Sequence, residues 1–105
     1  MPTESIFERF RSPGGTQVGT EGATLASATT VAPTHRIHVV SGTTEITTIT
    51  VPYTGFEGDI VFIPSGIFTL ATGGNVGLAA TAVVGKAMTL TYIKSTALWY
   101  PSYVA

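Results

Sequence analysis

The pattern of hydrophobic positions divides the chain into two unlike parts. From residue 34 to residue 105 apolar residues recur in short β-rich runs, whereas residues 1–33 carry few side chains that could form a core. Gly, Ala, Ser and Thr dominate residues 16–33, and such a stretch buries too little apolar surface to order itself. We therefore expect an extended N-terminal arm over 1–33 and a single β-rich body over 34–105.

Short strand signals follow one another through the body, separated by turns that contain Gly or Pro. Residues 59–63 are apolar on both faces, as in a central strand that is covered on two sides. In residues 87–92 the alternation places Met88, Leu90 and Tyr92 on the inward side. The expected strands cover 35–40, 45–51, 59–63, 67–72, 76–80, 81–84, 87–92 and 97–100. This pattern predicts an all-β fold, an antiparallel sandwich or barrel of about seven or eight short strands.

Residues 4–11 are the only part of the arm that combines charge with bulk. Ile6, Phe7 and Phe10 would share one side of a single helical turn. One turn is not stable alone in water, but each apolar side chain could contribute about 1.5–3 kcal/mol when buried on a partner. We interpret the segment as an anchor, with a frayed terminus as the alternative. The candidate partner-binding residues are Ile6, Phe7, Arg9, Phe10 and Arg11.

The rest of the arm is predicted to be a tether. Pro13, Gly14 and Gly15 break any helix behind the anchor. Residues 25–31 have enough β-propensity to add an edge strand to a sheet. The arm could therefore dock on another protein or be exchanged between copies of this chain, and the sequence leaves both open.

Composition adds a need for partners. The chain has 105 residues and no Cys, so disulfides and thiolate metal sites are excluded. A body this small is only marginally stable alone, and small domains compensate with disulfides, metals or partners. The mean hydropathy is +0.38, and from Ile60 onward the only charged side chains are Lys86 and Lys94. We expect other chains to cover part of this apolar surface in a homo-oligomer, with a Thr-coated monomer as the alternative.

Charge and hydropathy also argue against other partners. Charged residues make up 10% of the chain and the formal net charge is −1, so there is no basic surplus to neutralise phosphates. The first residues lack the features of a signal peptide, and no run of about 18 apolar residues predicts a membrane span. We expect no nucleic-acid and no membrane partner, and synthesis in the cytoplasm.

The sequence offers no persuasive active site. His35 and His38 lie three residues apart, which on a strand sends them to opposite faces and prevents them from sharing a metal. Glu57 and Asp59 could form an acid–base pair in a small hydrolase, but solvated residues beside a strand are the commoner reading. The motif Gly-x-Ser-x-Gly is absent. We predict that the protein is not an enzyme and binds no cofactor or metal.

Two further patterns are open to more than one interpretation. Residues 73–77 (GGNVG) are glycine-rich, but a strand-like segment follows them, which predicts a hairpin turn and not a phosphate loop. Most aromatic residues are expected in the core. Trp99, Tyr100 or Tyr103 could instead form an exposed shelf that binds sugar.

Five motifs in order carry a resemblance over about half of the chain: TGFEG at 54–58, IPSGIF at 63–68, TGGNV at 72–76, ATAVV at 80–84 and LWYPSY at 98–103. Together they resemble a module of structural proteins of tailed bacteriophages. Such modules occur in virion-attached fibres and in small capsid decoration, or cement, proteins, and neither group is enzymatic. Fibre modules normally follow repeats or coiled-coil heptads, which this sequence lacks, so the chain is more similar to cement proteins.

The resemblance implies a trimer that sits between capsomers and reaches over its neighbours. We therefore predict a virion protein on the capsid exterior that binds the major capsid protein and stabilises the shell. The alternative is a tail-fibre module that binds a receptor or carbohydrate. The resemblance implies no residue-level binding site, so the anchor at Ile6, Phe7 and Phe10 rests on composition.

Overall fold

The computed structural model describes residues 21–105, which fold into short strands with no helical residue in that range. The all-β class is thus confirmed for the described residues. The five candidate anchor residues, Ile6, Phe7, Arg9, Phe10 and Arg11, lie outside them. The strands are β1 (Leu25–Ala26), β2 (Thr30–Val31), β3 (Ile37–Ser41), β4 (Thr48–Ile49), β5 (Gly58–Pro64), β6 (Thr69–Leu70), β7 (Ala80–Thr81), β8 (Met88–Ile93) and β9 (Leu98–Pro101).

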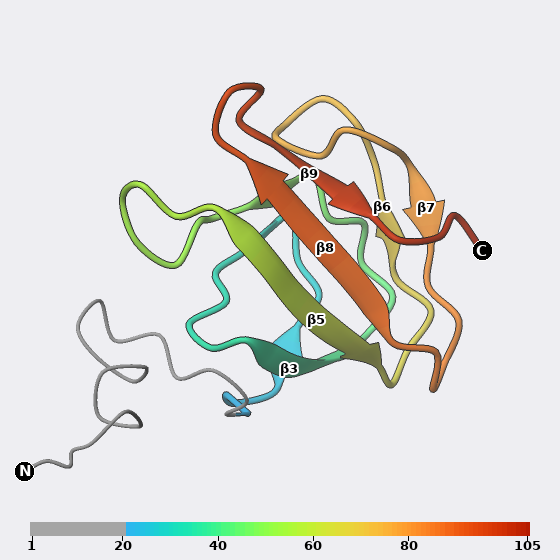
Figure 1. Ribbon diagram of the computed structural model, residues 1–105. Coiled ribbons are helices and arrows are strands. Elements are labelled where there is room, and N and C mark those ends of the chain that lie inside the picture. Colours follow the sequence, from blue (N-terminus) through green and yellow to red (C-terminus); the bar gives the residue numbers. More distant parts are fainter. Residues whose placement is uncertain (1–20) are drawn as a thin grey trace, which may run out of the picture.

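The main sheet has five strands in the order β1-β3-β5-β8-β9 (Figure 1). The β5–β8 and β8–β9 pairs are antiparallel, but β1–β3 and β3–β5 are parallel. The expectation of a purely antiparallel sheet is therefore wrong. The reason lies in residues 42–57, which leave the sheet through β4 and return, so that β5 begins at the same end as β3. Parallel neighbours require such a crossover.

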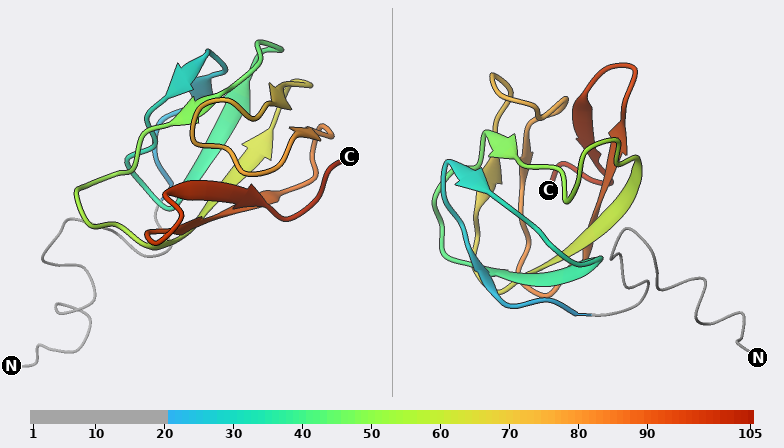
Figure 2. Two further views of the ribbon diagram at one scale, coloured as in Figure 1. Left: turned by 90° about the horizontal axis from the view of Figure 1, so that it is seen from above. Right: turned by 90° about the vertical axis from the view of Figure 1, so that its left-hand side faces the viewer.

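A second layer lies behind the main sheet (Figures 1 and 2). It contains the parallel pair β2–β4 and the antiparallel pair β6–β7. Bridges from Ile46 to Leu70 and from Val76 to Trp99 connect its segments with one another and with β9. The buried core residues lie between the two layers: Val40, Ile60, Phe62, Met88, Leu90 and Trp99 from the main sheet, and Val31, Ile46, Ile49, Phe68, Leu70 and Val76 from the second layer.

Residues 21–33, which the sequence assigns to the arm, pack with the body. The Gly22 N–H donates to the Ile37 carbonyl at 2.8 Å and the Ser27 N–H to the Ser41 carbonyl at 2.7 Å, while Val31 belongs to the core. The expected boundary after Pro33 is thus not the edge of the packed body. Backbone groups make the pairing, so a segment of Gly, Ala, Ser and Thr can join a sheet edge without bulky side chains. We call residues 21–26 the strap.

Several expected strands are shorter in the structure. Only Thr48–Ile49 pair within 45–51, only Thr69–Leu70 within 67–72, and only Ala80–Thr81 within 76–84. Side chains and isolated bridges satisfy the backbone between these pairs, as they do around Ile46 and Val76. The central position predicted for residues 59–63 is confirmed, because β5 lies in the middle of the main sheet. The predicted cover on both faces is not found within the described residues, since Val61 and Ile63 are only half-buried.

Candidate functional site

The candidate site is the face of the main sheet that points away from the core. The strand register places Ile37 beside Val61 and Val39 beside Ile63, and all four side chains are half-buried. Figure 1 looks onto this side of the sheet, and no described segment crosses it. We define the outer face by Ile37, Val39, Ser41, Asp59, Val61, Ile63, Thr89 and Thr91.

The outer face is apolar on β3 and β5 and polar on β8. Ile37, Val39, Val61 and Ile63 lie side by side on the parallel pair, and Thr89 and Thr91 continue the face on β8. Asp59 is the one charged residue of the outer face, and its Oδ1 accepts a hydrogen bond from the Thr91 hydroxyl at 2.8 Å. The centre of the face, around Val61 and Ile63, is uncharged. Because large uncovered apolar patches on proteins often serve in interactions, we treat this half-buried apolar surface as the candidate site.

A second apolar patch lies where two loops meet. Ile67 is 55% exposed and Val84 is 56% exposed. The loops are held together because the Ala82 N–H donates to the Phe68 carbonyl and the Gly85 N–H to the Pro64 carbonyl, both at 2.9 Å. Part of the apolar surplus in the sequence is therefore located at these two loops.

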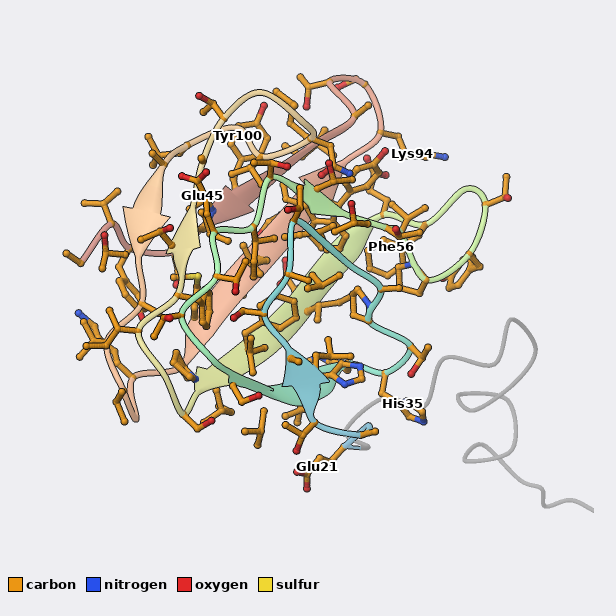
Figure 3. The ribbon with its side chains drawn as sticks, turned by 180° about the vertical axis from the view of Figure 1, so that it is seen from behind. Glu21, His35, Glu45, Phe56, Lys94 and Tyr100 are labelled. Carbon is orange, nitrogen blue, oxygen red and sulfur yellow. The ribbon has the colours of Figure 1, made fainter. Side chains whose placement is uncertain are left out.

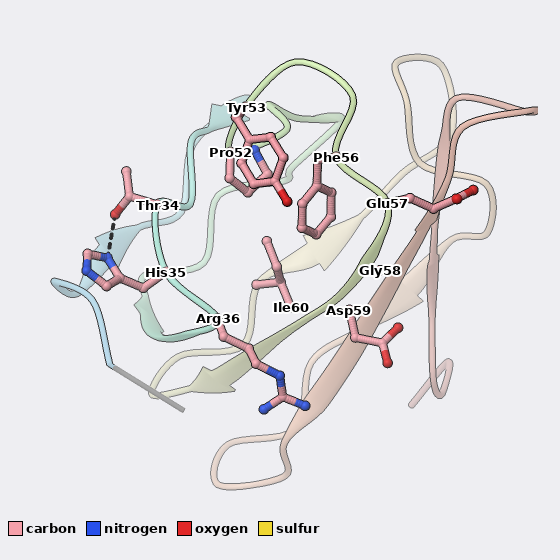
Figure 4. Close-up of a pocket in the computed structure, with 10 residues that line it drawn as sticks. All are labelled: Thr34, His35, Arg36, Pro52, Tyr53, Phe56, Glu57, Gly58, Asp59 and Ile60. Carbon is pink, nitrogen blue, oxygen red and sulfur yellow. Dashed lines mark hydrogen bonds between the residues drawn. The ribbon is translucent and has the colours of Figure 1, made fainter. Parts of the chain in front are cut away.

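A cavity of about 200 Å³ opens between residues 34–36 and the loop that leads into β5 (Figure 4). Its apolar wall includes Tyr53, which is 41% exposed and packs edge-to-face on Phe56 at 5.5 Å. Phe56 in turn stacks on the buried Trp99 at 5.7 Å, which fixes this wall. Arg36 and Asp59 lie at the polar side of the opening (Figure 4). The cavity can accept a small group with one apolar and one polar side.

Glu57 and Asp59 both line the cavity, as the hydrolase alternative requires. Each carboxylate already has a partner on the β8–β9 hairpin. Glu57 Oε2 accepts from the Lys94 N–H at 3.1 Å, and Asp59 Oδ1 accepts from Thr91. Figure 4 shows Glu57 pointing away from the cavity. These contacts hold the β5 entry to the hairpin and do not converge on a common substrate position.

The two histidines play different roles. His38 is buried, and its Nε2 accepts hydrogen bonds from the N–H groups of Thr34 and His35, both at 3.0 Å. Nδ1 donates to the Ala23 carbonyl at 2.7 Å, which assigns the proton to Nδ1. His38 therefore fastens the strap to the start of β3. A Cβ at Gly22 would collide with this ring, so only Gly allows the close approach.

Within residues 21–105, no group of three or more His, Cys, Asp or Glu side chains is arranged to hold a metal ion. His35 and His38 do lie near each other, with ring centroids 5.9 Å apart. Both nitrogens of His38 are engaged by the backbone, and His35 Nδ1 lies 2.8 Å from the Thr34 hydroxyl. The described part of the chain also contains no helix of the length and hydropathy that a membrane span requires.

The proposed sugar-binding shelf is wrong in its central member. Trp99 is fully buried, and its Nε1 donates to the Ile49 carbonyl at 2.9 Å. Tyr100 and Tyr103 are half-buried; the Tyr100 hydroxyl donates to Thr96 at 3.1 Å and that of Tyr103 to the Lys86 carbonyl at 2.8 Å. Among residues 21–105 the exposed aromatic residue is Tyr53, and its position in a loop with Pro52 and Gly55 is its one sequence signal.

Asn75 has a structural role that its sequence pattern does not reveal. The chain turns at residues 72–75, as predicted, and Gly73 adopts φ +123°. The Asn75 side chain then accepts from the Ile49 N–H and donates to the Ile49 carbonyl, both at 2.7 Å. One amide side chain thus replaces a neighbouring strand for Ile49 and fixes the second layer.

Comparison with protein-family models, with curated proteins and with solved structures found no match to this chain.

Proposed function

We propose that this protein is a structural component of a virion, a homotrimeric capsid decoration protein that binds the outer surface of the major capsid shell and stabilises it. The observation that carries the proposal is the outer face, where Ile37, Val39, Val61 and Ile63 form an apolar surface that no described segment covers. Such a surface supports binding to protein and offers no catalytic chemistry.

The strap supports attachment of the protein to the shell through its N-terminal arm. It runs parallel to β3 through the bridge from Glu21 to Ile37 and the pairing of Leu25 with Val40. Tension applied through residues 1–20 would act parallel to the strand and shear these backbone hydrogen bonds. Several of them must then break together. His38 adds a buried contact at the same place. The strap is therefore suited to transmit tension from an anchored arm to the body.

In the proposed mechanism the two layers form a sandwich that plugs a junction between capsomers. Ile6, Phe7 and Phe10, with Arg9 and Arg11 beside them, bind the neighbouring capsid subunits. Three arms on one trimer act multivalently, so modest contacts in each arm combine into tight attachment. Closed threefold symmetry would cover apolar body surface as well. The shell gains cross-links that resist internal pressure.

The test measures the binding of three full-length proteins to empty capsid shells: the unsubstituted chain and two substituted forms. Replacing Ile6, Phe7 and Phe10 together by Ser should abolish attachment, whereas the matched pair Arg9→Gln and Arg11→Gln should weaken it only in part. Binding is measured by co-sedimentation, and shell strength by the temperature at which shells open. Shells that open at the same temperature with and without bound protein would refute the stabilising role.

The cavity beside Tyr53 supports a second candidate, a receptor- or carbohydrate-binding module of a tail fibre. An exposed tyrosine ring facing Arg36 and Asp59 is an arrangement that can stack a sugar ring and bind its hydroxyl groups. If labelled protein binds bacterial surface glycan and not empty shells, and Tyr53→Ala removes that binding, this candidate replaces the capsid proposal.

A further inference from the structure

The outer face lacks a cover within the described chain, although β3 and β5 place Ile37, Val39, Val61 and Ile63 side by side on it. Inner residues of the same strands are shielded completely; Phe62 and Met88, for example, are 0% exposed. Val61 and Ile63 alternate with them along β5 and are only half-buried. Any cover for these side chains would come from outside residues 21–105.

The chain itself supplies a segment at this place. Glu21 bridges to Ile37, so the residues that precede it join the body at the edge of the outer face. Neighbouring strands are about 4.8 Å apart, which puts Val61 about 10 Å from the strap. The ten residues between Phe10 and Glu21 span up to about 35 Å when extended. Residues 6–10 can therefore reach every strand of the outer face.

The chemistry of the two surfaces matches. Ile6, Phe7 and Phe10 are the only large apolar residues in the first fifteen positions after Met1, and the outer face presents β-branched side chains without charge at its centre. Pro13, Gly14 and Gly15 lie between this segment and the strap, where a chain reversal would be needed. Arg9 and Arg11 would then lie close enough to the face for one of them to meet Asp59 at its margin.

We propose that in the free protein residues 6–10 lie on the outer face of their own chain, and that the capsid shell takes this segment over on attachment. The second half rests on the proposed function. The same three side chains cannot fill both places at once, so the face and the shell compete for them. The covered state would keep two apolar surfaces from water before assembly, and it would lower the apparent affinity for the shell by the covered fraction.

Because the chain has no Cys, pairs of cysteines can report this contact without background. Ser5→Cys leaves Ile6, Phe7 and Phe10 intact. It is combined with Thr89→Cys or, as a second position, Ser41→Cys, both on the outer face. The matched control combines Ser5→Cys with Glu45→Cys, an exposed position that Figure 3 shows from the opposite side of the molecule. The full-length variants are treated with oxidised glutathione and analysed by non-reducing electrophoresis and mass spectrometry.

We expect an intrachain disulfide in both outer-face pairs and none in the control. A covalent dimer would place the segment on a second copy and overturn the assignment to the same chain. Failure of both outer-face pairs to cross-link, or equal cross-linking of the control, would overturn the proposal altogether. Two face positions are used so that one poorly folded variant does not decide the result.

Binding to empty shells then tests the takeover. The reduced Ser5→Cys/Thr89→Cys protein should bind, and the oxidised form should lose binding until reductant is added. Equal binding of both forms would overturn the takeover while leaving the cover in place. The unsubstituted chain is tested on shells as well. If it fails to bind, although the intrachain disulfide forms in the cysteine variants, the proposed function fails and the cover on the outer face stands.

Discussion

Along β5 the two faces of the main sheet both carry large apolar residues and yet differ in environment. Along β5, Ile60 and Phe62 point inward and are 2% and 0% exposed, while Val61 and Ile63 point outward and are half-buried. Side-chain hydrophobicity does not separate the two sets. The difference arises because the second layer covers one face and no described residue covers the other.

The largest test of this comparison sets Phe62→Ala against Val61→Ala. Phe62 packs edge-to-face on Phe68 at 6.4 Å in the core, so its truncation leaves a cavity and should lower the free energy of unfolding by about 3–5 kcal/mol. Val61 is half-buried, and its truncation should cost about 1 kcal/mol. Urea denaturation of both variants measures the two losses. Equal losses would mean that the outer face is already as tightly packed as the core.

The inner face also contains one buried polar residue, His38. Substituting it tests whether its hydrogen bonds or the burial of its ring stabilise the fold. His38→Phe retains an aromatic ring but leaves the N–H groups of Thr34 and His35 and the Ala23 carbonyl without their partner. We expect a loss of about 3 kcal/mol.

The signature of this loss should be local as well as global. Amide exchange at Gly22 should accelerate together with the fall in stability, because its N–H bonds to Ile37 at the site that His38 fastens. His35→Phe is the matched control and should cost less than about 1 kcal/mol, since His35 is only half-buried. If His38→Phe costs no more than the small loss expected for His35→Phe, burial of the ring, which Phe retains, and not its hydrogen bonds holds the strap.

Much of the main sheet is predictable from local pattern, and the reasons are visible in β5 and β8. Continuous apolar character marks β5 as central, and alternation marks Met88 and Leu90 as inward, as found. The parallel pairing of β3 with β5 is not predictable in this way, because it depends on where the crossover returns. The short length of β4 within the predicted strand 45–51 is not predictable either, since the Asn75 side chain completes the hydrogen bonding of Ile49.

The candidate sites also combine features that are predictable from the sequence with features that are not. The outer face could be anticipated as an apolar surplus but not placed, because the register that brings Val61 beside Ile37 is a long-range property. The Asn75 contact has no local signal, since a Gly-Gly-Asn segment is equally compatible with a simple turn. The packing of the strap is not visible in its apolar content, because backbone hydrogen bonds and His38 hold it.

Substituting Asn75 tests how much its side chain stabilises the second layer, which covers the inner face. In Asn75→Ala the Ile49 carbonyl keeps the hydrogen bond from Trp99 Nε1, so that only the Ile49 N–H loses its partner. We expect a loss of about 1–2 kcal/mol in urea denaturation. Thr72→Ala, an exposed change in the same connection, should stay within about 0.5 kcal/mol. A loss below that of Thr72→Ala would show that water replaces the amide without cost, and the second layer would be a looser cover than the core suggests.

The smallest expected effect lies in the hairpin between β8 and β9, outside both faces. Ala97 adopts φ 57°, a left-handed conformation that costs a residue with Cβ about 1 kcal/mol or more. Ala97→Gly removes this strain but adds about 0.5–1 kcal/mol of unfolded-state entropy, so stability should rise by less than about 1 kcal/mol. Ala87→Gly, at an exposed position without a positive φ, has no strain to relieve and should lose about 0.5 kcal/mol. In thermal unfolding, a gain for Ala97→Gly and a loss for Ala87→Gly would assign the Ala97 effect to the backbone. A loss of stability in both variants would show that the hairpin carries no strain that Gly can relieve.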